Sequence, residues 1–141
     1  MLTVMERLYM HWEAAKSVVP EEQIVGVFLR GSQNYGLDNP TSDVDSLCLV
    51  VPSVRDVAMM RPPVAKEIKV GTDGGHVTLM DIREFVKQIR RQNPNILEVL
   101  FTKFMLRGEG FGLNFYQLYA KREELARYDR YAMVQSTLGM A

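Results

Sequence analysis

The chain has 141 residues, the length of a single domain, and 47% of them are hydrophobic, so it is expected to fold around a core. Seventeen acidic residues balance seventeen basic ones, which excludes a strong overall attraction to nucleic acid but leaves room for a local basic face. One cysteine excludes an internal disulfide, and no apolar run approaches the roughly 18 residues of a membrane span, so a soluble cytoplasmic domain is expected.

The first third of the chain predicts one helix and two buried strands. Apolar residues recur at helical spacing over residues 2–18, and Pro20 ends that helix. The continuous apolar run 24–30 is typical of a strand buried on both faces, and residues 43–51 are expected to form a second buried strand. We expect these two strands to lie next to each other in one sheet.

The middle of the chain predicts a hairpin followed by a helix. Residues 53–60 are expected to form a short helix, and residues 66–80 a β-hairpin around the turn "GTDGG". In the next segment, "DIREFVKQIRRQ", apolar residues share one helical face. Asp81 followed three residues later by Glu84 resembles a capping box.

The last third predicts further helices. "NPNILEVLF" is expected to start a helix with Asn93 as the cap and Pro94 in the first helical position, and residues 107–112 to form a flexible break. From Asn114 onward the chain is expected to be helical. The order of elements indicates a mixed α/β or α+β fold, a small twisted mixed sheet of about four strands with helices packed on it.

Two polar groups lie at the ends of the predicted buried strands. Asp43 and Asp45 alternate along a strand and therefore project from the same side, where their mutual repulsion favours a bound divalent cation. Mg²⁺ takes carboxylate oxygens together with substrate phosphates. Gly31 and Ser32 follow the other strand, where backbone amides and a hydroxyl can hold phosphate. Either pair alone can be only a turn, but together they predict a metal site beside a phosphate site.

The stretch "GSQNYGLDNPTSDVDSLCLVV" resembles the signature of the DNA polymerase beta-like nucleotidyltransferase superfamily. The Tyr-Gly-Leu and Ser-Asp-x-Asp details, with "NPNILEVLF" and "YAMVQSTLGM", resemble a branch of predicted nucleotidyltransferases of bacteria and phages, some linked to RNA repair. The resemblance covers roughly residues 24–137. It implies a palm-like nucleotidyltransferase core over residues 1–106, with residues 107–141 as a helical extension packed on it, shorter than the family expects.

The resemblance also implies a reaction. Such enzymes transfer a nucleoside monophosphate from an NTP to a hydroxyl and release pyrophosphate. Asp43 and Asp45 would then bind Mg²⁺ or Mn²⁺. The resemblance also implies four nucleotide-binding residues: Gly31, Ser32, Arg30 and Tyr35.

The third carboxylate that the superfamily carries on a neighbouring strand is not evident. Its matching position holds His76, which is a candidate base but a poor Mg²⁺ ligand. Glu67, on the other arm of the hairpin, is a candidate third ligand if it faces the site. Asp81 lies at odd spacing from His76, so we interpret it as a helix cap, and Asp73 as part of the turn.

Two functions remain open on these grounds. The first is a metal-dependent nucleotidyltransferase whose acceptor is an RNA 3′ end, a protein or a small molecule. The second is a catalytically degenerate module that binds nucleotide, metal or a protein. Under either function, a second copy or a partner protein is expected to complete the C-terminal region. The predicted helix after the hairpin carries a basic stripe that either is simply solvated or contacts acceptor phosphates; it comprises Arg83, Lys87, Arg90 and Arg91.

Overall fold

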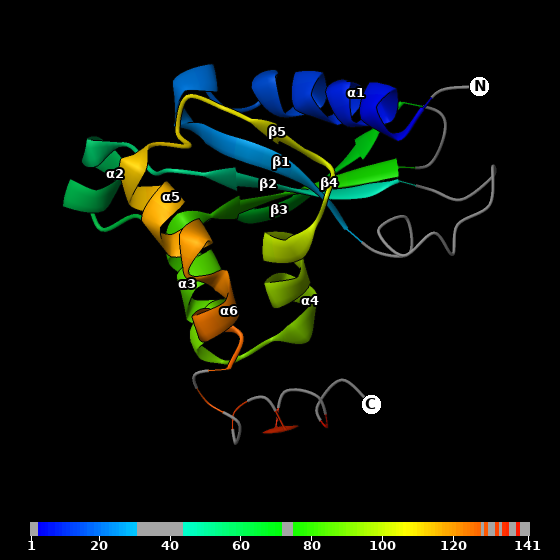
Figure 1. Cartoon of the computed structure of the whole chain (residues 1–141). Helices are drawn as coiled ribbons and strands as arrows, with labels where there is room; N and C mark the ends of the chain where they lie inside the picture. The colour runs from blue at the N-terminus through cyan, green and yellow to red at the C-terminus, as the bar shows by residue number, and fades with distance from the viewer. Residues whose placement is uncertain are drawn as a thin grey trace.

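A five-stranded mixed sheet organises the structure, a computed structural model that describes residues 3–30, 44–71 and 75–127 and positions 129, 132, 134, 135 and 138. The strands lie in the order β3-β4-β2-β1-β5 (Figure 1). Their bounds are β1 Ile24–Arg30, β2 Asp45–Val50, β3 Ala65–Val70, β4 Gly75–Asp81 and β5 Met105–Arg107. Only β2 and β4 pair in parallel; the other neighbours are antiparallel.

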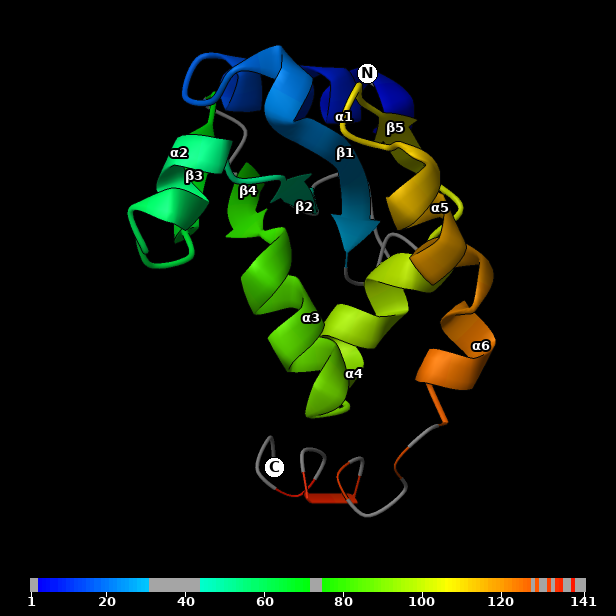
Figure 2. The ribbon, with the colours of Figure 1, turned by 90° about the vertical axis from the view of Figure 1, so that its left-hand side faces the viewer.

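Helices cover both faces of this sheet. α1 (Val4–Lys16) lies across one face, and α3 (Ile82–Arg90) lies on the other (Figures 1 and 2). The remaining helical segments are η1 Glu21–Gln23, α2 Val54–Ala58, α4 Pro94–Leu97, η3 Glu98–Phe101, α5 Leu113–Ala120 and α6 Arg122–Leu125. α2 and β3 form the connection between the parallel strands β2 and β4, so the chain crosses over to return in the same direction.

The central strands are buried on both sides, and their side chains alternate between two apolar cores. In β2, Leu47 and Leu49 pack with Phe85 of α3, whereas Cys48 packs with Leu8 of α1 on the opposite face. Burial of this kind supplies the main favourable free energy of folding. It also raises the pKa of the Cys48 thiol to about 12.

Most of the elements expected from the sequence are present. The first helix, both buried strands, the short helix after them and the hairpin all form close to their expected positions. Asn93 caps α4 by accepting a hydrogen bond from Asn95 N at 3.1 Å, and Pro94 occupies its first turn.

Three expectations need adjustment. The sheet has five strands rather than about four, because β5 pairs antiparallel with β1 and includes Arg107, the first residue of the segment that was expected to be only a flexible break. The helix at "NPNILEVLF" continues after Leu97 as the 3₁₀ helix η3. Asp81 caps α3, but it accepts from Arg83 N, and Glu84 instead accepts a hydrogen bond from Gln88, so the capping box does not form.

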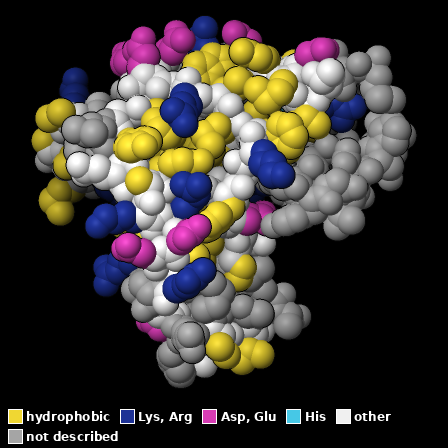
Figure 3. All heavy atoms as spheres, viewed as in Figure 1, with side chains coloured by type: hydrophobic (Ala, Val, Ile, Leu, Met, Phe, Trp, Pro, Cys, Tyr) yellow, Lys and Arg dark blue, Asp and Glu magenta, His cyan; other side chains and the backbone are white. Residues whose placement is uncertain are grey.

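An apolar groove of about 600 Å³ lies between α5 and the start of α3, away from the polar end of the sheet. It is lined by Val25, Val51, Ile82, Gly110, Gly112, Phe115 and Leu118. Figure 3 shows apolar side chains gathered on the face seen in Figure 1, with Lys and Arg between them. In the described part of the chain, none of the helices has the length and apolar character needed to cross a membrane.

Candidate functional site

Three neighbouring strands bring polar side chains together at one end of the sheet. Arg30 of β1 pairs in register with Asp45 of β2, and Asp45 pairs in register with His76 of β4. β2 lies between β1 and β4, and β1 ends where β2 and β4 begin, so Arg30, Asp45 and His76 form a row across the sheet with Asp45 in the middle. Asp45 alternates with the α1-facing Ser46, so its carboxylate projects toward the face that carries α3 and α4.

A polar pocket of about 390 Å³ opens at this point. The strands provide most of its lining, and the α4–η3 segment contributes the rest. It is lined by Arg30, Asp45, Glu67, His76, Thr78, Asn95 and Glu98. Three carboxylates, one guanidinium and one imidazole therefore share a small volume, which is a composition suited to charged or polyhydroxylated ligands rather than to apolar ones.

His76 lies between two carboxylates. Its Nδ1 is 3.7 Å from Asp45 Oδ1, and its Nε2 is 3.7 Å from Glu67 Oε1. The Asp45 side chain is 58% exposed and the Glu67 side chain 63%, so both carboxylates remain accessible to a ligand. Glu67 reaches the site because it pairs in register with Thr78, two residues from His76 on the same face of β4.

The residues predicted for the site divide into two groups. Arg30, Asp45, Glu67 and His76 meet in one pocket. The other four, Gly31, Ser32, Tyr35 and Asp43, lie outside the described residues, as does the turn residue Asp73. The roles assigned to all of them therefore remain predictions.

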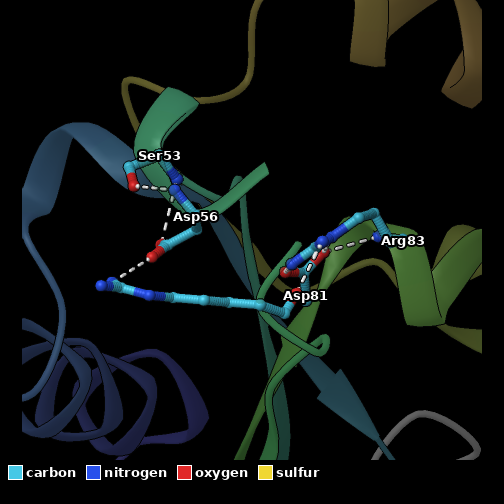
Figure 4. Close-up of polar contacts among 5 residues, drawn as sticks. Ser53, Asp56, Asp81 and Arg83 are labelled. Atoms are coloured by element: carbon cyan, nitrogen blue, oxygen red, sulfur yellow. Dashed lines mark hydrogen bonds and ion pairs between the residues drawn. The ribbon is translucent and has the colours of Figure 1, made fainter. Parts of the chain in front are cut away.

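Asp81 is separate from this pocket, as its odd spacing from His76 predicted. It ends β4 five residues after His76, about 17 Å along the strand. Its buried carboxylate accepts hydrogen bonds from the backbone of Arg83 at 2.7 Å and from its guanidinium at 2.8 Å (Figure 4). Asp81 is thus the N-cap of α3 and has a structural role.

The same contact limits the basic stripe on α3. Hydrogen bonding to Asp81 raises the pKa of Arg83, and Arg83 Nη1 also donates to Arg61 O at 3.0 Å. Arg61 in turn pairs with Asp56, whose pKa is lowered by hydrogen bonding to Ser53 and to Arg61. Arg83 is therefore part of a network that joins α2 to α3. The other stripe residues, Lys87, Arg90 and Arg91, are exposed.

Three pocket residues, Thr78, Asn95 and Glu98, were not predicted as site residues from the sequence. Asn95 and Glu98 stand three positions apart, on the side of the α4–η3 segment opposite the buried Ile96 and Leu97. A polar pair at i, i+3 between buried apolar positions was the available signal. It indicates a shared face, but only the tertiary structure shows that this face meets the ends of the strands.

The donor chemistry of the pocket suits a hard divalent cation. The carboxylates of Asp45 and Glu67 and the hydroxyl of Thr78 are oxygen ligands of the type that Mg²⁺ prefers. Among the described residues, no three His, Cys, Asp or Glu side chains are close enough together to hold a metal ion by themselves. A complete ligand set would need Asp43, substrate oxygens or water in addition.

Comparison with known proteins agrees with this geometry. The family described as RlaP, RNA repair pathway DNA polymerase beta family, matches residues 4–133, and the match includes α1 as well as the strands of the site. No curated protein matches the chain. Because the family match spans most of the 141 residues, this chain belongs to the RNA repair pathway DNA polymerase beta family, a polymerase beta-like nucleotidyltransferase family.

Proposed function

We propose that the chain transfers a nucleoside monophosphate from an NTP to a hydroxyl group, with release of pyrophosphate, and depends on a divalent metal. The observation that carries this proposal is the position of Asp45, an accessible carboxylate that begins β2 beside Arg30 and His76 in a polar pocket. Family membership makes nucleotidyl transfer the first reaction to test.

The acceptor we propose is an RNA end. The family description names an RNA repair pathway, and the exposed basic side chains of Lys87, Arg90 and Arg91 form a surface that suits phosphate groups. The pocket itself favours hydroxyl groups, because its carboxylates and amide accept hydrogen bonds from them.

In the proposed reaction the acceptor oxygen forms a bond to the α-phosphorus, and the bond from that phosphorus to the bridging oxygen breaks. Pyrophosphate leaves with the electron pair. Asp45, with Asp43, would hold Mg²⁺ or Mn²⁺, which supplies Lewis-acid stabilisation of the phosphoryl oxygens. Arg30 would bind phosphate oxygens by charge-assisted hydrogen bonds.

His76 would accept the proton of the acceptor hydroxyl at an unprotonated ring nitrogen. The imidazolium that results would lie between the carboxylates of Asp45 and Glu67, each 3.7 Å from a ring nitrogen, and both would stabilise it. Glu67 thereby contributes negative charge on the strand next to the one where the superfamily carries its third carboxylate.

The test is transfer of label from each α-³²P-labelled NTP to RNA that ends in a 3′ hydroxyl, with Mg²⁺ or Mn²⁺. Asp45→Asn should reduce transfer by at least about a hundredfold, because an amide cannot replace an anionic metal ligand. Glu22→Gln, an exposed carboxylate beside the start of β1, is the matched control and should leave transfer unchanged. Label from γ-³²P-labelled NTP should appear in pyrophosphate and not in RNA.

Absence of transfer from all four NTPs to RNA, protein and small-molecule acceptors would overturn the enzyme proposal. If Mg²⁺-NTP then still raised the melting temperature of the wild type but not that of Asp45→Asn, the chain would be a nucleotide-binding module. That second function has support in His76, which stands where the superfamily has a carboxylate.

A further inference from the structure

A buried polar pair lies directly behind the candidate site. His11 of α1 and Ser46 of β2 are joined by a 2.7 Å hydrogen bond between Nδ1 and Oγ. Their exposed fractions are 2% and 1%, and the layer between α1 and the sheet is otherwise built largely from apolar side chains such as Leu8 and Cys48.

Packing of this layer does not require a polar pair for the stability of the fold. Burying a hydroxyl and an imidazole costs free energy that the mutual hydrogen bond only offsets, and apolar residues of similar shape can be as stable. The hydrogen bond adds a specific geometry, because it holds Ser46 Oγ of β2 at a fixed position relative to His11 Nδ1 of α1.

His11 lies next to both β2 and β4, the strands that carry Asp45 and His76. Ser46 follows Asp45 in β2, and Gly75 precedes His76 in β4. The His11 ring packs against Gly75 so closely that a Cβ on that glycine would stand 3.0 Å from His11 Nε2. The His11 imidazole therefore lies against Ser46 and Gly75. These are the chain neighbours of Asp45 and His76, which pair in register between β2 and β4.

We propose that His11 is a positioning residue, which sets the separation of Asp45 and His76 from the opposite face of the sheet. The expected effect on nucleotidyl transfer rests on the proposed function, whereas the expected effect on the separation of Asp45 and His76 does not. Successive residues of a strand point to opposite faces, so a contact that holds Ser46 and Gly75 also orients the side chains next to them. A displacement of about 1 Å at a reacting centre can lower a rate by about a hundredfold.

The test uses two replacements of nearly equal shape. His11→Asn keeps a polar atom at the position of Nδ1 and can still bond Ser46 Oγ. His11→Leu has the same branching without polar atoms, and combining it with Ser46→Ala removes both partners of the Nδ1–Oγ hydrogen bond, so that neither is left without the other. Cys48→Ala is the matched control, since it deletes one heavy atom from the same face of β2, two residues farther from the site.

Kinetics of nucleotidyl transfer provide the first readout. For His11→Leu/Ser46→Ala we expect a kcat at least about tenfold lower, with KM for the NTP within about twofold and a urea midpoint close to that of the wild type. His11→Asn should retain most of the kcat, and Cys48→Ala all of it. A folded double variant with wild-type kcat would overturn the proposal.

A second readout does not depend on activity. The chain has two histidines, so in His11 variants the remaining imidazole signals in an NMR spectrum belong to His76. We expect these signals, and their broadening by Mn²⁺, to differ from the wild type in the double variant and to match it in His11→Asn and Cys48→Ala. Unchanged His76 signals in the double variant would refute the positioning role. Absence of transfer in the wild type would instead refute the proposed function, with the NMR result still deciding this inference.

Discussion

Gly75 offers a sharp test of how tightly the two site strands are joined. A Cβ at this position would stand 2.7 Å from Val44 O, a backbone atom, and 3.0 Å from the buried ring of His11. Ordinary contact begins at 3.4 Å, so Gly75→Ala requires a shift of about 0.7 Å between β4 and the residue before β2. Val44 O also accepts the 3.1 Å hydrogen bond from His76 N, which this shift would lengthen.

The expected magnitude follows from two opposing effects. Overpacking of a closed site costs about 1–3 kcal/mol, and a backbone obstacle places this case toward the upper end. Alanine also restricts the unfolded chain, which returns about 0.4–1 kcal/mol. We therefore expect Gly75→Ala to lower the free energy of unfolding by about 1–2 kcal/mol.

Equilibrium unfolding in urea measures this change, and Gly112→Ala is the control. A Cβ at Gly112 would meet no atom within 4 Å, so only small effects of helix capping and chain entropy apply, and the change should stay within about 1 kcal/mol. Equal stability of the two variants, or a stabilised Gly75→Ala, would show that β4 does not press against Val44 as described.

Three further predictions concern other parts of the molecule. Because burial raises the pKa of the Cys48 thiol to about 12, the thiolate is nearly absent at pH 8, and mass spectrometry should find Cys48 unmodified by iodoacetamide in native protein but alkylated in urea. Arg83→Ala should lower the urea midpoint through loss of its contact with a buried carboxylate, whereas Lys87→Ala, on the exposed face of the same helix, should not. In the transfer assay, Glu67→Gln should reduce kcat by about tenfold or more, while Glu98→Gln should raise the acceptor KM and leave kcat nearly unchanged.

Local patterns in the sequence were sufficient for much of the fold. The apolar runs that became β1 and β2 are long, β-branched and bounded by breakers, and the hairpin arms flank a glycine-rich turn. β5 was not foreseen because it has three residues and owes its strand conformation to pairing with β1, a tertiary contact that no local pattern indicates.

The candidate site was predictable only in part, for a similar reason. Alternation along a strand predicts which side chains share a face, and this places Asp45 correctly with respect to its own strand. It does not predict the register between strands. Glu67 reaches His76 only because β3 pairs with β4 so that Glu67 faces Thr78, and a slip of one residue would turn it to the other face.

At the start of β2, one face of the strand contributes a pocket residue and the other face contributes a contact with α1. Asp45 presents its carboxylate to the pocket, and Ser46, one residue later, bonds the helix that covers the other face. A sequence pattern records both residues as polar positions near a strand start, but it does not show that His11, 35 residues earlier, completes the second contact. We therefore expect changes to α1 near His11 to alter the proposed nucleotidyl transfer without touching the pocket. Family members that lack this histidine should carry either another hydrogen-bonding residue there or an apolar residue in place of Ser46.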